Sequence, residues 1–100
     1  MEGQASISSE VLARYASDAA REIEGVRGLV ASQLHIHRCV RVSGEDGAVN
    51  VELHLDVDWG ARLPELGRDV QRRVLDYLER MTGSRPAAVN VVIDSIGPSR

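Results

Sequence analysis

The chain has 100 residues, which is enough for one small domain with a single hydrophobic core. Arginine supplies all 12 basic residues against 15 acidic ones, so the net charge is −3 and the positive charges are scattered along the chain. This balance disfavours nonspecific binding to nucleic acid or to anionic lipid, because both require clustered positive charge.

Three features of the sequence predict where the protein is located. No apolar run approaches the length of a membrane-spanning helix, and the N-terminus lacks the basic and then apolar pattern of a secretion signal. The single cysteine, Cys39, excludes an internal disulfide and is typical of a reducing compartment. We therefore expect a cytoplasmic protein. Residues 1–7 are predicted to be a frayed N-terminus, residues 8–97 one domain and residues 98–100 a tail.

The first predicted element is an amphipathic helix that begins after Ser8 or Ser9, either of which can cap its N-terminus. Its apolar face continues to Ile23, and two glycines, Gly25 and Gly28, are expected to end it. Glu22 lies near that face. It is interpreted either as a half-buried carboxylate that could act as an acid or base, or as a carboxylate paired with an arginine or with backbone amides. We favour the paired carboxylate, because no second catalytic group is evident nearby.

Two runs with a period of two follow, over residues 34–42 and 49–57, and each predicts a strand with one buried and one polar face. The turn residues between them, Gly44 to Gly47, predict that the two strands form a hairpin. The apolar spacing then changes to that of a helix, with Pro64 in its first turn and Gly83 just past its end.

The last predicted element is a strand over residues 88–96. Val89, Val91 and Ile93 alternate, while Val92 and Ile96 are apolar on the other parity, so part of this strand is expected to be covered on both sides.

The expected fold is α+β, in the order α-β-β-α-β. A three-stranded mixed sheet, with strand order 2-1-3, places the first strand of the hairpin in the centre, and two helices pack on one face. The other face of the sheet is expected to be polar, and open to water or to another subunit.

The polar side of the first strand contains the strongest candidate for a metal site, His35, His37 and Cys39. If the hairpin pairs Ser43 with Ala48, then His37 lies opposite His54, Cys39 opposite Glu52 and His35 opposite Asp56. Histidine, thiolate and carboxylate are zinc ligands. The simpler interpretation, which we favour, is an ordinary polar sheet face without metal. A third is a pH-sensitive histidine patch.

Two other features of the sequence are candidate sites. Gly44-x-x-Gly47 matches the outline of the nucleic-acid-binding loop of KH domains, but it is expected to join two strands and contains two acids, so nucleic-acid binding is not expected. Trp59 follows a strand and either plugs the end of the core, which we favour slightly, or anchors a partner. No phosphate-binding loop, zinc-helix pattern or nucleophile elbow is present, so we expect no enzymatic activity and no cofactor.

Several segments together resemble the alkaline shock protein family, an envelope stress response family of Gram-positive bacteria. The first is the run from Ile7 to Leu12 with the later Glu24-Gly25-Val26-Arg27-Gly28. The others are Trp59-Gly60, Leu63-Pro64-Glu65, Val70-Gln71, Met81-Thr82-Gly83 and Val89-Asn90-Val91. The resemblance implies a non-enzymatic protein of cell-envelope homeostasis that self-associates, with a membrane-embedded protein as a possible further partner.

The leading hypothesis is therefore a self-associating interaction module whose contacts come from the polar sheet face and an unpaired sheet edge. Its candidate interaction residues are His54, Trp59 and Val92. The alternatives are a metal- or pH-sensing domain that uses His35, His37, Cys39 and His54, and a KH-like nucleic-acid-binding domain.

Overall fold

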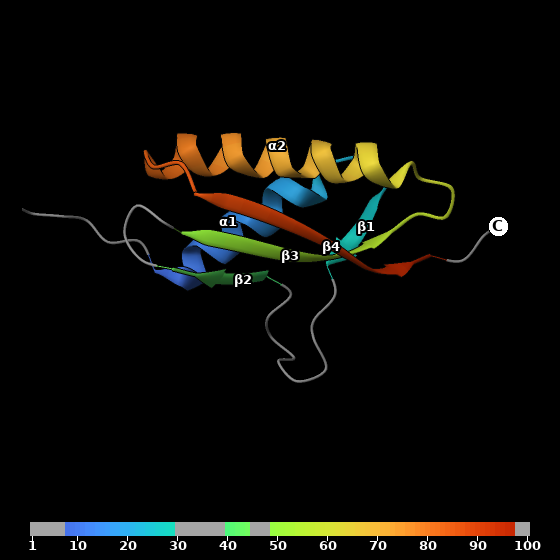
Figure 1. Cartoon of the computed structure of the whole chain (residues 1–100), viewed down its shortest axis with the longest axis horizontal. Coiled ribbons are helices and arrows are strands. Elements are labelled where there is room, and N and C mark those ends of the chain that lie inside the picture. Colours follow the sequence, from blue (N-terminus) through green and yellow to red (C-terminus); the bar gives the residue numbers. More distant parts are fainter. Residues whose placement is uncertain (1–7, 30–39, 45–48, 98–100) are drawn as a thin grey trace, which may run out of the picture.

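The computed structural model describes residues 8–29, 40–44 and 49–97. Two helices and four strands follow one another in the order α1, β1, β2, β3, α2 and β4. Both helices lie on one side of a single sheet, which confirms the predicted α+β class (Figure 1). The structure adds one short strand, β1, to the elements that the sequence predicted.

The first helix, α1, spans Ser9–Arg21 and begins as predicted. The Ser8 hydroxyl accepts a hydrogen bond from the Val11 N–H at 3.2 Å, which satisfies one of the free amides of the first turn. Three alanines of this helix, Ala16, Ala19 and Ala20, are fully buried, and their small size lets the helix approach the sheet closely.

The extra strand β1, Val26–Leu29, begins where the sequence predicted only the end of the helix. Gly25 has a φ of 103°, a left-handed conformation that turns the chain from the helix into this strand. β1 shows no regular alternation in the sequence, because the strand has only four residues, includes Gly28 and has a bulge.

The predicted hairpin is present as β2, Val40–Ser43, and β3, Asn50–Val57. The rest of the first predicted strand, residues 34–39, lies outside the described residues. The hairpin register differs from the predicted one: Ser43 is opposite Asn50, and Arg41 rather than Cys39 is opposite Glu52. A shift of two residues keeps every side chain on the same face, so hydrophobic alternation cannot distinguish the two registers.

The position of the central strand also differs from the expectation. β3 occupies the centre, where the first strand of the hairpin had been expected. β1 and β2 pair with one edge of β3, both antiparallel. β4, Ala88–Ile96, pairs with the other edge in parallel, so the sheet is mixed as predicted. Within the described residues, β3 is the longer strand of the hairpin, and it pairs with other strands along both of its edges.

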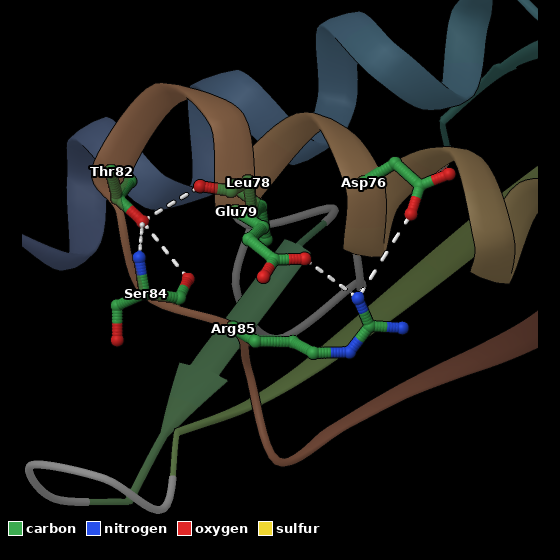
Figure 2. A network of polar contacts seen from close by, with 6 residues as sticks. All are labelled: Asp76, Leu78, Glu79, Thr82, Ser84 and Arg85. Atoms are coloured by element: carbon green, nitrogen blue, oxygen red, sulfur yellow. Dashed lines mark hydrogen bonds and ion pairs between the residues drawn. The ribbon is translucent and has the colours of Figure 1, made fainter.

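The second helix, α2, spans Leu63–Thr82, with Pro64 in its first turn and Gly83 in a left-handed conformation at its end, as predicted. Figure 2 shows how the chain is held beyond that end. The Thr82 hydroxyl donates to the Leu78 carbonyl at 2.7 Å and accepts from the Ser84 N–H at 3.1 Å. The Arg85 guanidinium lies 2.7 Å from Glu79 and 4.0 Å from Asp76 (Figure 2). These contacts fix the turn that leads into β4.

The core lies between the helices and one face of the sheet. Its fully buried large side chains are Leu53, Leu55, Leu78, Val51, Val57, Val70 and Val74. A bulge in β4 between Ile93 and Ser95 places Ile96 opposite Val57, on the core side of the sheet rather than on the polar parity that the sequence indicated. Ile96 nevertheless remains 46% exposed, because it lies at the end of the sheet.

We expect Leu53→Ala to lower the free energy of unfolding by about 2–5 kcal/mol, because it removes a fully buried side chain from the central strand and leaves a cavity. Met81→Ala is the matched control, since Met81 is 44% exposed on α2 and its truncation leaves no cavity. Urea denaturation followed by circular dichroism measures both variants. Equal losses in the two variants would contradict this description of the core.

Candidate interaction surface

The face of the sheet opposite the helices is the candidate site. We call it the polar sheet face and define it by Arg27, Arg41, Glu52, His54, Asp56, Asn90, Val92 and Asp94. The even-numbered side chains of β3 reach this face because its odd-numbered ones are buried beneath the helices. In the part of the chain that the structure describes, no helix lies over this face (Figure 1).

His54 is held between two carboxylates. Its Nε2 lies 2.7 Å from Glu52 on the same strand, and its Nδ1 lies 2.8 Å from Asp94 on the neighbouring strand β4. Only the protonated imidazolium can donate a hydrogen bond from both nitrogens, so this arrangement favours the charged ring. Partial burial lowers the pKa of His54, but the hydrogen bonds and charges of Glu52 and Asp94 outweigh that effect and raise the pKa above its ordinary 6.5.

A second charged contact lies where β3 ends. The Nε of Arg27, on β1, is 3.8 Å from a carboxylate oxygen of Asp56. The guanidinium of Arg27 also lies where a Cβ at Gly97 would be, so a side chain at this position would displace the flexible end of Arg27. The Arg27 side chain therefore crosses the sheet from β1 to the end of β4, over the central strand.

The structure places only part of the predicted metal cluster. His35, His37 and Cys39 lie outside the described residues. His54 is present, but its two carboxylate neighbours bind opposite nitrogens of the ring, so they do not converge on one ion. Among the described residues, no group of three or more His, Cys, Asp or Glu side chains could hold a metal ion.

The other two predicted interaction residues are accessible. Val92 is directly beside His54 across the β3–β4 pair and is half-buried. Trp59 is 65% exposed, so the interpretation that it plugs the core is wrong. Val57, at the end of β3, and Leu66, in the first turn of α2, are buried.

Two further interpretations from the sequence are resolved. Glu22 forms an ion pair with Arg73 of α2, as the favoured interpretation expected, and its side chain is 49% exposed. β2 and β3, the described strands on either side of residues 45–48, pair antiparallel, whereas the loop of a KH domain is flanked by two helices.

Asp94 is a partner of His54 that the sequence did not predict. Asp94 lies two residues after Val92, so the alternation of the strand places both side chains on the same face of the sheet. This spacing could have predicted that Asp94 lies on the polar sheet face. The error in the central strand concealed this contact, because the predicted sheet order separated β4 from the strand that contains His54.

The match to known families is extensive. A family model described as the alkaline shock protein 23 family, with a cell envelope-related function, matches residues 1–98. This chain belongs to that family. As a member of the alkaline shock protein 23 family, it is similar to the uncharacterized protein YloU of Bacillus subtilis, with 24% identity over 106 residues, 94% of this chain and 88% of YloU.

Solved structures of the MamM C-terminal domain have a similar fold. A form with two substitutions matches with a TM-score of 0.65 and 18% identity, over 94% of this chain and 86% of that one. A substituted form described as a zinc form matches with a TM-score of 0.59 and 14% identity, over 90% and 87% of the two chains. At this identity the likeness concerns the fold alone. No helix in the described residues of this family member is long and apolar enough to cross a membrane.

We expect His54 to make stability depend on pH. Because its pKa is higher in the folded state, the charged ring contributes stability that is fully present below about pH 6.5 and is lost as the pH rises through the folded-state pKa. Urea unfolding between pH 5.5 and 9 should show this loss in the natural protein and its absence in His54→Gln. Asp94→Asn, which keeps the ring but removes one carboxylate, should reduce it. An identical pH dependence in all three proteins would contradict the assignment.

We expect Trp59→Ala to change the free energy of unfolding by no more than about 0.5 kcal/mol, because the side chain is largely exposed. A tryptophan buried in the core would instead cost about 3–5 kcal/mol on truncation. Thermal and urea unfolding by circular dichroism measures the difference without relying on tryptophan fluorescence. A loss of several kcal/mol would show that Trp59 packs into the core.

Proposed function

We propose that this protein is a non-enzymatic, self-associating interaction module of the cell envelope stress response or of envelope homeostasis. Its family has a cell envelope-related function, which supports the cellular role. The observation that supports an interaction role most directly is the polar sheet face, a whole side of the sheet without a covering helix in the described residues.

The chemistry of this face suits contact with protein rather than catalysis. Its charges are largely matched within the chain, since His54 is placed between Glu52 and Asp94. Matched charges lower the cost of desolvating a surface when a partner covers it. Val92 adds an apolar group at the centre of the network, which a partner could bury. Glu22, the one candidate acid or base in the sequence, is occupied by Arg73.

Trp59 extends the proposal to a second protein partner. An exposed tryptophan is a typical anchor at protein interfaces, because it buries a large area at little cost in conformational entropy. We propose that Trp59 contacts a further protein, which could be membrane-embedded and could hold this protein at the cytoplasmic side of the membrane. Direct insertion into the membrane and binding of nucleic acid are not part of the proposal.

The second candidate function is pH sensing, and the contacts of His54 favour it. A histidine between two carboxylates changes its charge over a narrow pH range above its usual pKa, and this would change the charge of the polar sheet face. Metal sensing by His35, His37, Cys39 and His54 stays a prediction from the sequence.

Light scattering tests the main proposal. The mass of the untagged protein should rise with concentration from the micromolar to the near-millimolar range. Val92→Asp should shift this rise to higher concentration by placing a charge in the contact, whereas Met81→Glu, an equivalent change on the exposed side of α2, should not. Metal content is read on the same sample. A constant monomer mass would refute self-association, and a monomer with stoichiometric zinc would favour the metal-sensing alternative.

A further inference from the structure

The outer edge of β4 is not paired with another strand in the described residues. β4 is bound to β3 along one edge only, and its nine residues include no proline, lysine or arginine. Natural proteins normally protect an edge strand with such residues, because free backbone groups pair readily with another chain. The bulge between Ile93 and Ser95 limits pairing only near the end of β4, so the part of the edge before it is a place where a further strand can bind.

The backbone groups on this edge can be identified. The side-chain amide of Gln71, on α2, donates to the Val89 carbonyl at 3.0 Å, so this carbonyl points away from β3. Because backbone groups alternate along a strand, the N–H and C=O groups of Val91 and Ile93 point to the same outer edge. Those of Val92 point toward β3. Gln71 thus covers the beginning of the edge and leaves its centre free.

We infer that a second copy of this chain pairs with this edge, β4 against β4, antiparallel and with the two-fold axis through Val92. This inference deepens the proposed self-association and depends on it. The unbonded backbone groups on the outer edge determine this register. Val91 pairs with Ile93 of the second copy, and the N–H and C=O groups of both residues form hydrogen bonds across the junction. Other symmetric registers would require Val89, whose carbonyl is already bound, or would place the bulge at Asp94 in the centre of the ladder.

The side chains are compatible with this register. It places the amide of Asn90 opposite the carboxylate of Asp94 of the second copy. The two Asp94 carboxylates therefore do not lie opposite each other. It also joins the two polar sheet faces into one, with both Val92 side chains in contact at its centre. Each His54 then lies one strand away from the junction.

Disulfide trapping tests this arrangement in the full chain, with Cys39→Ser as the background. Residues opposite each other in a pair without hydrogen bonds have Cα atoms about 4.5 Å apart, within the range for a disulfide. Val92→Cys should therefore form a covalent dimer under mild oxidation. Asn90→Cys is the matched control, because its two copies would be about 13 Å apart along the strands and should not cross-link. Circular dichroism confirms that both variants fold.

The possible outcomes separate this inference from the proposed function. Cross-linking at Val92 at least tenfold faster than at Asn90 supports the edge pairing. Equal rates, in a protein whose mass still rises with concentration, would overturn the pairing and leave self-association intact. A monomer at all concentrations would overturn both. Amide exchange gives a second measurement without a variant: protection of Val91 and Ile93 should rise with concentration, while that of Val92 should be high throughout.

Discussion

The two-residue period of β3 determines how the rest of the molecule is arranged. Its odd-numbered side chains are fully buried, and this requires both helices to lie on that one side of the sheet. Strands pair with both of its edges, so β3 connects every other part of the sheet. The same alternation sends Glu52, His54 and Asp56 to the opposite face, where they meet no helix in the described residues.

The polar sheet face is both fixed in geometry and balanced in charge. Its central histidine is hydrogen-bonded through both nitrogens, so the side chain is fixed, and its charge is balanced by carboxylates from two strands. A fixed and internally balanced polar surface loses little conformational entropy and little hydration energy when another protein covers it. This property supports the proposal that another protein covers the polar sheet face.

The family match concerns the cellular role of this chain, whereas the structural neighbours concern only its fold. Membership in the alkaline shock protein 23 family relates this chain to the cell envelope. The MamM C-terminal domains show that the same fold is found in chains of very different sequence, including one described as a zinc form. Because a fold supports many functions, the role of this chain must come from its own surface, where the described residues supply no converging set of metal ligands.

Local chemistry in the sequence determined the bounds of the main elements. Ser8 caps α1, Pro64 and Gly83 delimit α2, and alternation marks β3 and β4, because each of these signals acts within a few residues. The tertiary structure alone decided which strand is central, which register the hairpin has and that Asp94 reaches His54. Those choices depend on pairing between distant segments. Shifts of two residues and exchanges of strand position preserve every local pattern, so their energies differ only once the whole sheet is formed.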